Sequence, residues 1–267
     1  MFRIAEEVRA LIRPGDRVLD VGGAEETFPR ADVVLDIVPY GDRRPGPLHP
    51  EPERFTAETW HTGDICSPEI WSRFADDEFD FVLCSHTLED VRDPISVCAQ
   101  MVRVGRRGYI EVPSRLRECT REDRDVALAG WNHHRWIVDF EDGDLIFTAK
   151  MQWAHELDYL GYVRSKAHRE ACILDYRLQF LGLEWEGSFG FVERMAKGPV
   201  IETEELVRYF STFPFRRPPE PVRRASGTSH AGTFLSHREF QLPVEIGEDP
   251  HRLYARYQER MDGARSH

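Results

Sequence analysis

A group of reactive side chains stands near the middle of the chain, in the segment Trp131-Asn132-His133-His134-Arg135-Trp136. A histidine titrates near neutral pH, so His133 or His134 can act as a general base. The guanidinium of Arg135 can hold a carboxylate, phosphate or sulfate group of a substrate. These three residues are therefore candidate catalytic residues.

The same two histidines are not expected to form a metal site. Adjacent residues point to opposite faces of a strand, and no carboxylate or cysteine stands at helical spacing to join His133 and His134. A simpler alternative is that His134 and Trp136 only hold a hairpin against a sheet.

Further candidate residues follow short apolar runs. Residues 18–21 end in Gly22-Gly23, and glycine lets the backbone approach a ligand closely. Asp36 ends a second β-branched run, where an acid can accept both hydroxyl groups of a ribose. Asp64 follows a third run and can accept a hydrogen bond from an adenine amino group. Alternatively, both acids are ordinary loop residues and the glycines only turn the chain.

The elements that must position these residues are strands alternating with helices and loops. Strands are predicted at residues 17–21, 33–37, 60–65, 79–84 and 108–112. Helices are predicted over 2–12, over 68–74 and from Asp93-Pro94 to about Val104, and residues 39–52 read as a loop. This alternation indicates a Rossmann-like, doubly wound, mostly parallel α/β sheet. Such a sheet binds its ligand outside the carboxyl ends of its strands.

The second half of the chain has a different pattern. Residues 135–140 and 145–150 flank Glu141-Asp142-Gly143-Asp144, which is typical of a hairpin turn. Helices are predicted over 155–162, 170–181 and 250–261, a strand over 183–195, and a linker or mobile lid over 213–232. We therefore expect a nucleotide-binding core over residues 1–150. Residues 151–267 would form a C-terminal hairpin and helical extension that acts as a lid or interface.

The composition restricts the classes of molecule that the protein is expected to bind. The net charge is -12, from 35 basic and 47 acidic residues, and such a surface repels nucleic acid and anionic membranes. No apolar run reaches the length of a bilayer span, and the first residues do not form a secretion signal. The five cysteines lack CxxC spacing. We expect a cytoplasmic protein with reduced thiols and a small-molecule substrate, either a homodimer or one partner of a heterodimer.

The order of these motifs resembles the class I S-adenosylmethionine (SAM)-dependent methyltransferases. The most specific part is Phe-Asp-Phe-Val-Leu-Cys-Ser-His-Thr-Leu-Glu-Asp-Val-Arg-Asp-Pro at residues 79–94, which in many members marks strand four and the following turn. Residues 107–114 and the hairpin over 134–147 look like one bacterial branch of small-molecule enzymes. The resemblance covers residues 1 to about 150.

This resemblance implies SAM as the cofactor and assigns roles by position. The glycines would face its amino-acid part, Asp36 would hold the ribose, Asp64 and Ile65 would frame the adenine, and Ser85 and His86 would lie near the sulfonium. The predicted cofactor site comprises Asp20, Gly22, Gly23, Asp36, Asp64, Ile65, Ser85 and His86.

The resemblance also gives the candidate catalytic residues a reaction. Methyl transfer needs the two reactants positioned and sometimes a proton removed from the acceptor. Glu111, near the end of strand five, would orient the acceptor beside His133, His134 and Arg135. Similar residues occur in this branch whatever the substrate, which favours a packing role for His134.

The chain also departs from the family pattern. Ala24-Glu25-Glu26-Thr27 stands where a third glycine is usual, and two carboxylates there would repel the carboxylate of the cofactor unless they turn to solvent. Asp90 replaces the usual histidine after Glu89. Three hypotheses follow: a methyltransferase acting on a small metabolite, in specialised metabolism or sugar modification; a homologue repurposed for substitution or elimination; or a non-catalytic subunit of a complex.

Overall fold

A computed structural model describes residues 8–23, 27–43, 52–119, 129–151, 179–197, 205 and 231–234, the last four as backbone only. Several sequence predictions lie outside these residues. They are the glutamate pair of the glycine loop, the helices over 155–162 and 250–261, and most of the helix over 170–181 and of the linker over 213–232.

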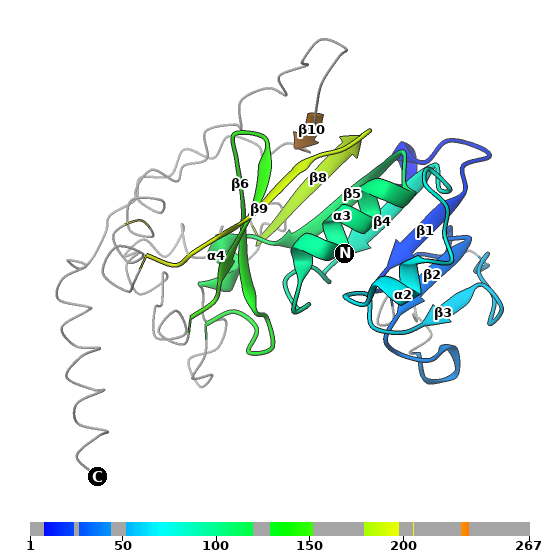
Figure 1. The fold of residues 1–267 in the computed structure, drawn as a ribbon, viewed down its shortest axis with the longest axis horizontal. Helices are drawn as coiled ribbons and strands as arrows, with labels where there is room; N and C mark the ends of the chain where they lie inside the picture. Colours follow the sequence, from blue (N-terminus) through cyan, green and yellow to red (C-terminus); the bar gives the residue numbers. More distant parts are fainter. Residues whose placement is uncertain are drawn as a thin grey trace.

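The main sheet has seven strands in the order β10-β8-β5-β4-β1-β2-β3 (Figure 1). The first five in sequence are parallel: β1 (Val18–Val21), β2 (Val33–Asp36), β3 (Trp60–Thr62), β4 (Phe81–Ser85) and β5 (Arg107–Pro113). β8 (Phe180–Glu186) runs antiparallel to β5, and β10 (Ala231–Phe234) runs antiparallel to β8. The expected mostly parallel α/β sheet is confirmed.

Alternate residues of the parallel strands supply two separate hydrophobic clusters, one on each face of the sheet. Leu19, Leu35 and Val82 belong to one cluster, whereas their neighbours Val34 and Phe81 belong to the other. A strand buried on both faces reads as a continuous apolar run, which is the pattern that the sequence shows. Because successive side chains of a strand point to opposite faces of the sheet, the position of a residue along the strand determines which cluster its side chain joins.

Helix α3 (Pro94–Val104) packs on the first cluster and begins as the sequence predicts. The side chain of its N-cap residue Asp93 accepts a hydrogen bond from the Ser96 N–H at 2.9 Å, and Pro94 occupies the first turn. The short helix α2 (Pro68–Trp71) contributes buried side chains to the same cluster. On the other face, residues 8–11 are helical and Val8 is buried in the second cluster. The sheet is thus covered on both faces.

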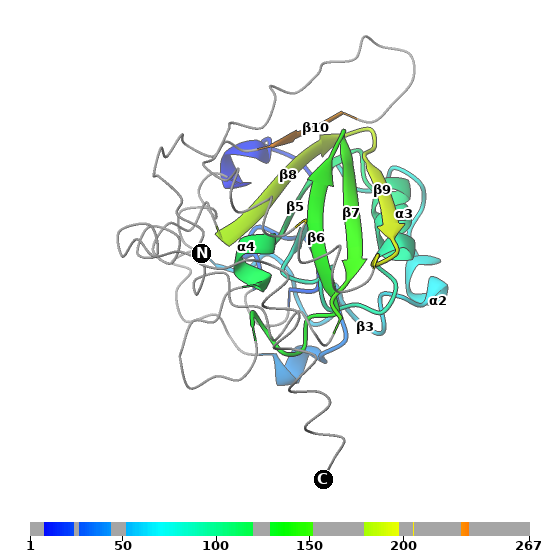
Figure 2. The same ribbon diagram turned by 90° about the vertical axis from the view of Figure 1, so that its left-hand side faces the viewer.

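A second sheet, of three strands, lies beside the first (Figure 2). Its order is β6-β7-β9, formed by β6 (Trp136–Glu141), β7 (Asp144–Ala149) and β9 (Gly190–Arg194). Asp142 and Gly143 both have positive φ, 53° and 100°, as a two-residue hairpin turn requires, so the predicted hairpin is confirmed. Helix α4 (Arg115–Glu118) is tied to β6 by the buried ion pair between Arg115 and Asp139.

Four sequence predictions need correction. The single strand over 183–195 is wrong, because Gly187, with φ 74°, divides this segment into β8 and β9, which join different sheets. The helix over 170–181 does not reach its predicted end, since β8 already begins at Phe180. The linker over 213–232 ends in β10, and the loop over 39–52 contains the short 3-10 helix η1 (Tyr40–Asp42).

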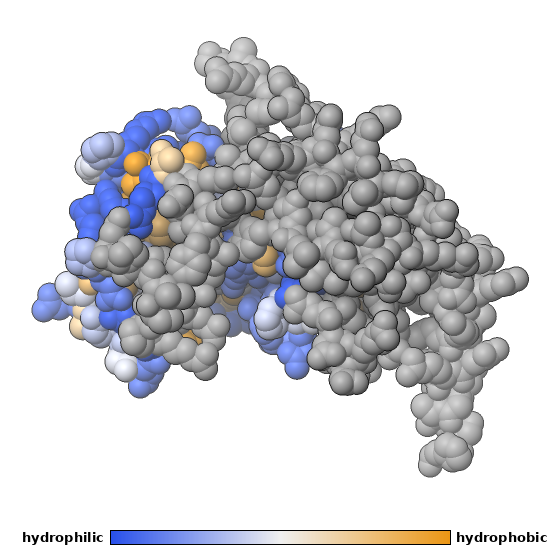
Figure 3. Space-filling model, turned by 180° about the vertical axis from the view of Figure 1, so that it is seen from behind, coloured by the Kyte–Doolittle hydropathy of each residue, from blue (hydrophilic) through white to orange (hydrophobic). Residues whose placement is uncertain are grey.

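The boundary at residue 150 stays a prediction, although β8 and β10 from the C-terminal part pair with strands of the N-terminal part. Where Figure 3 displays described residues, they are mostly hydrophilic, with small apolar patches between them. Within the part of the chain that the structure describes, no helix combines the length and the apolar character needed to cross a bilayer.

The contact between β4 and β5 generates a stability prediction at Gly108. A Cβ there would overlap the backbone carbonyl oxygen of Val82 and lie 2.8 Å from the Trp185 ring. Backbone cannot rotate away, so Gly108→Ala should lower the free energy of unfolding by about 3 kcal/mol. Urea unfolding measures this loss. Gly41→Ala is the control, because its Cβ would meet nothing within 4 Å. Equal stability of the two variants would contradict the β4–β5 packing.

Candidate functional site

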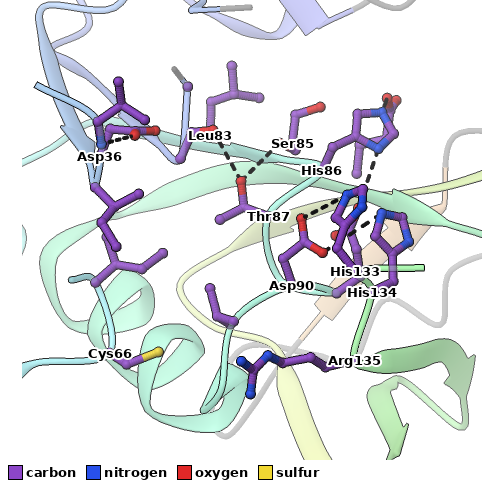
Figure 4. A pocket seen from close by; sticks show the side chains of 18 of the residues that line it. Asp36, Cys66, Leu83, Ser85, His86, Thr87, Asp90, His133, His134 and Arg135 are labelled. Carbon is purple, nitrogen blue, oxygen red and sulfur yellow. Dashed lines mark hydrogen bonds and ion pairs between the residues drawn. The ribbon is translucent and has the colours of Figure 1, made fainter. Parts of the chain in front are cut away.

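A cavity of about 940 Å³ opens at the carboxyl ends of β1, β2, β4 and β5. This is the edge at which an open α/β sheet binds its ligand, because the strand order reverses at β1: β2 and β3 lie on one side of it, and β4 and β5 on the other. Figure 4 shows Asp36 at one end of the cavity and Asp90, His133 and His134 at the other. Its walls contain every predicted site residue except Asp20: Gly22, Gly23, Asp36, Asp64, Ile65, Ser85, His86, Glu111, His133, His134 and Arg135.

Gly22 and Gly23 form the turn after β1, and both positions exclude a side chain. Gly22 has a φ of 80°, and a Cβ on it would overlap the side chain of Thr87. A Cβ on Gly23 would lie 2.5 Å from Oδ2 of Asp20. Thr87 follows β4 and donates to the carbonyl oxygen of Ser85 at 3.1 Å. Contacts from β4 and β1 therefore keep the backbone of this turn at the cavity wall.

Asp36 is the last residue of β2 and is buried at the cavity wall. Its Oδ1 accepts a hydrogen bond from the Val38 N–H at 2.7 Å, which fixes the carboxylate at the end of the strand. An acid held at this position can accept hydrogen bonds from ribose hydroxyl groups.

Asp64 lines the cavity, but its carboxylate already has partners. It forms an ion pair with Arg92 and accepts the Cys66 N–H at 2.9 Å. The Arg92 guanidinium holds the pKa of Asp64 below its ordinary value. An adenine amino group would compete with Arg92 for this side chain, whereas the neighbouring Ile65 is a buried apolar wall suited to the adenine ring.

Asp20 lies behind Gly23 and not in the cavity wall. Its Oδ2 accepts the Phe28 N–H at 2.8 Å, so the carboxylate fastens the segment that follows the glycine turn. Burial raises the pKa of Asp20 to about 7; the bond from Phe28 lowers it and the charge of Asp36 raises it. The structure therefore gives this residue a supporting position in the predicted cofactor site.

His86 follows β4 and lies between two carboxylates. Its Nε2 is 2.9 Å from Oε1 of Glu111, and its Nδ1 is 3.6 Å from Oε1 of Glu89. Burial lowers the pKa of His86, but the two carboxylates outweigh that effect and raise it to about 9. The imidazole is charged at neutral pH and is a hydrogen-bond donor there, not a base. Its φ of 52° is unusual for a residue with a side chain and is typical of functional sites.

The same contacts fix Glu111, the acid on β5. The Tyr109 hydroxyl donates to Oε2 of Glu111 at 2.9 Å, while His86 occupies Oε1. Glu111 therefore holds the His86 ring in place and reaches the cavity beside it. Its predicted role in orienting an acceptor stays a prediction.

Glu89 is fully buried at the cavity, at a position for which the sequence predicted no role. Among the described residues, neither of its carboxylate oxygens has a hydrogen-bond partner. Burial raises the pKa of Glu89, and the His86 imidazole 3.6 Å away lowers it. The carbonyl oxygen of Glu89 accepts the N–H groups of Arg135 and Trp136 at 2.7 and 3.1 Å, which anchors the start of the hairpin.

His134 is positioned by a chain of buried charges. Its Nδ1 lies 2.5 Å from Oε1 of Glu118, and Oε2 of Glu118 accepts a hydrogen bond from Nζ of Lys150 at 2.6 Å. Lys150 also donates to the carbonyl oxygens of Ala129 and Trp131 at 3.0 Å each. Because a carboxylate accepts at Nδ1, the proton of the neutral ring lies there and Nε2 presents a lone pair.

His133 and His134 converge on Asp90. Nε2 of His133 is 3.8 Å from Oδ2 of Asp90, and Nε2 of His134 is 3.9 Å from Oδ1. The expectation that the two histidines point apart is wrong, because they lie in the loop before β6 and not on a strand. Burial raises the pKa of Asp90, and the two imidazoles lower it.

Arg135 and Trp136 have different surroundings. Arg135 is exposed at the cavity edge, apart from the histidines (Figure 4), and no described carboxylate pairs with its guanidinium. Trp136 donates from Nε1 to the carbonyl oxygen of Val91 at 2.8 Å and packs against the core. The proposed packing role fits Trp136, whereas the role of Arg135 in holding a substrate group stays a prediction.

Of the site residues that were not predicted, some could have been found from the sequence and others could not. Glu89 and Asp90 follow β4 directly, so the rule that chemistry lies after a parallel strand points to them. Glu118 and Lys150 come from α4 and the end of β7, and only the tertiary structure brings them to His134. No sequence pattern links these three positions.

Comparisons with known proteins give matches to parts of the chain. The family described as methionine biosynthesis protein MetW matches residues 61–116. No curated protein sequence matches the chain. One similar structure is a complex between the Trm112 methyltransferase activator of Haloferax volcanii and a candidate methyltransferase. It has 18% identity and a TM-score of 0.31, and the match covers 40% of this chain and 50% of that one.

Two further structures are similar to part of the chain. An S-adenosylmethionine-dependent methyltransferase from Mesorhizobium loti has 18% identity and a TM-score of 0.30, with 43% of this chain and 56% of that one covered. The N-terminal domain of EvdMO1, crystallised in the presence of SAH and D-fucose, has 19% identity and a TM-score of 0.30, with 51% and 57% covered.

The chain thus spans about half the length of the solved structures that it matches. Its five parallel strands, in the order β5-β4-β1-β2-β3 with the antiparallel β8 beside β5, and its cavity at their carboxyl ends form a class I methyltransferase fold. The resemblance noted in the sequence is confirmed at the level of the fold.

The raised pKa of Asp20 predicts a pH dependence of stability. The folded state binds the Asp20 proton more tightly than the unfolded state, for which the ordinary value is 3.8. The stability contributed by this proton is complete below that value and is lost as the pH rises towards about 7. Asp20→Asn, which keeps an acceptor for Phe28, should remove this loss, at most about 1.4 kcal/mol per pH unit.

Urea unfolding of wild type and variant at pH 5 and pH 8 measures this difference. The wild type should lose more stability than Asp20→Asn between the two pH values. Asp42→Asn, on η1, is the control for removing an exposed carboxylate. Parallel pH profiles for wild type and Asp20→Asn would show that Asp20 is already ionised in the folded protein.

Proposed function

We propose that this protein is a SAM-dependent methyltransferase that acts on a small molecule. The observation that carries the proposal is that one cavity joins the glycine turn and Asp36 at one end to a cluster of ionisable side chains at the other. Its volume of about 940 Å³ is at the upper end of the range for small-molecule sites. Such a cavity has room for a nucleoside-bearing donor together with an acceptor.

The residues at the Asp36 end fit the donor. Asp36 would accept hydrogen bonds from the ribose, Ile65 would contact the adenine, and the backbone of Gly22 and Gly23 would approach the amino-acid part closely. The sulfonium would then face the end of β4, at Ser85 and His86. His86 is a cation there, and the carboxylate of Glu111 at 2.9 Å offsets its charge towards a positively charged donor.

Bound there, SAM would supply an electrophilic methyl group, which passes to a nucleophilic atom of the acceptor as the carbon–sulfur bond breaks and its electron pair stays on sulfur. The protein residues would hold the acceptor in line and keep water out. His133, His134 and Asp90 form the acceptor end, where a proton must leave or the acceptor must be activated. Arg135 would contact an anionic group of the acceptor at the cavity edge.

The surroundings of this site extend the proposal. The net charge of -12 disfavours nucleic acid and anionic membranes as targets, and we propose a cytoplasmic protein that acts on a metabolite. Residues 151–267 would serve as a lid or an interface, in a homodimer or with another chain. The repurposed homologue and the non-catalytic subunit remain alternatives. Donor binding without methyl transfer would favour the former, and absence of donor binding the latter.

Donor binding tests the proposal directly. Calorimetry should detect micromolar binding of SAM and of S-adenosylhomocysteine to the full chain. Asp36→Ala should weaken both about tenfold or more, because the ribose hydroxyl groups lose their acceptor, a loss of roughly 1–3 kcal/mol. Asp42→Ala, the same substitution on the exposed η1 turn, is the control. No binding by wild type at millimolar SAM, or equal affinity of Asp36→Ala, would refute the proposed donor site.

The acceptor end makes a separate prediction. His134→Ala should slow transfer of a labelled methyl group from SAM to a small-molecule extract at least about tenfold. SAM affinity should stay within about twofold of wild type, because His134 lies at the other end of the cavity from Asp36. Unchanged transfer together with a large fall in melting temperature would show that His134 only packs the loop against Glu118.

A further inference from the structure

We propose that Asp90, His133 and His134 bind one divalent transition-metal ion at the acceptor end of the cavity. The set comprises two imidazole nitrogens and one carboxylate, which is a donor set suited to zinc or iron(II). All three residues line the cavity, so an ion held by them would keep further coordination positions open to a ligand there.

The geometry brings the three donor atoms around one point. One ligand atom from each residue lies within 4.8 Å of the other two. The two Nε2–carboxylate distances, 3.8 and 3.9 Å, are too long for hydrogen bonds. Two ligands with metal bonds of about 2.1 Å are about 3–3.5 Å apart. Both Nε2–carboxylate contacts would therefore shorten by a few tenths of an ångström, and donor atoms as far apart as 4.8 Å would approach by about 1.3–1.8 Å. His133 is exposed on a loop and can make such a shift.

The carboxylate of Asp90 has room for a cation beside it. Its Oδ1 is buried, and it has no hydrogen-bond partner among the described residues. A buried carboxylate oxygen without a partner is costly, and a cation beside it would remove that cost. The proposed ion would lie between this oxygen and Nε2 of His134, which are 3.9 Å apart.

The surroundings of His134 are those of a metal ligand. Metal-binding histidines usually donate their other ring N–H to a carboxylate, which fixes the tautomer and the ring orientation. Here Nδ1 is 2.5 Å from Glu118, and Lys150 holds Glu118 from the opposite side. This arrangement leaves the Nε2 lone pair directed towards Asp90, as coordination requires.

This assignment also specifies the chemistry of the acceptor, and in that respect it rests on the proposed methyltransferase function. An ion at this point would bind an acceptor oxygen and lower its pKa, so that the oxygen loses its proton and becomes a nucleophile. His134 would then act as a ligand and not as the general base. Acceptors with a hydroxyl group, rather than a carbon nucleophile, fit such a site.

Metal binding can be measured without any substrate. The full chain is stripped with a chelator and then titrated with Co²⁺, followed by its visible absorption, and with Zn²⁺, followed by calorimetry. We expect one equivalent to bind at the cluster with micromolar or tighter affinity. Asp90→Asn and His133→Ala should each weaken this binding at least about tenfold. His61→Ala is the matched control, because His61 lies on β3 and contacts Arg73.

Failure of either variant to change the affinity would overturn the inference, as would the absence of Co²⁺ absorption bands and Zn²⁺ heat at millimolar metal. His133 is exposed, so His133→Ala should fold even if Asp90→Asn does not. The same samples titrated with SAM keep the two proposals distinguishable. Metal binding without SAM binding would refute only the donor site, and SAM binding without metal binding would refute only the metal site.

Discussion

The carboxyl ends of parallel strands lie at one edge of a sheet, and in this protein acidic side chains gather at that edge. Asp20, Asp36, Glu89 and Glu111 lie on or directly after β1, β2, β4 and β5, and all are buried. Burying a charge is unfavourable unless a partner compensates it. Most of the local structure follows from how these acids are compensated, and the proposed donor is the partner that would complete the set.

Each acid is compensated in a different way. Asp20 has a raised pKa and a bond from the Phe28 N–H, whereas Asp36 accepts from Val38. Glu111 pairs with a protonated His86 and with Tyr109. Glu89, in contrast, keeps carboxylate oxygens without described hydrogen-bond partners. Among these four acids, Glu89 is therefore the one whose carboxylate is available to a bound ligand.

The sequence predicts the parallel sheet well, because strands buried on both faces have continuous apolar runs and glycines or acids at their ends. Asp36 and the Asp142-Gly143 turn were predictable for the same kind of reason: each position has a local geometric requirement that few residue types meet. The division of residues 183–195 was not, since a turn at Gly187 sends two similar apolar strands into different sheets.

The arrangement of His133 and His134 could not be predicted from their spacing. The expectation assumed a strand, but the histidines lie on a loop whose shape depends on Glu118 and Lys150, residues distant in the sequence. Contacts of this kind are set by the packing of α4 against the second sheet, through Arg115 and Asp139. Local sequence patterns do not predict these contacts.

A crystal structure of the full chain with S-adenosylhomocysteine tests most directly whether an adenosyl donor binds along the carboxyl edge of the sheet. The ribose hydroxyl groups should lie against Asp36, and the sulfur should face Ser85 and His86. A nucleoside bound elsewhere, or side chains filling this edge in the complex, would contradict this placement.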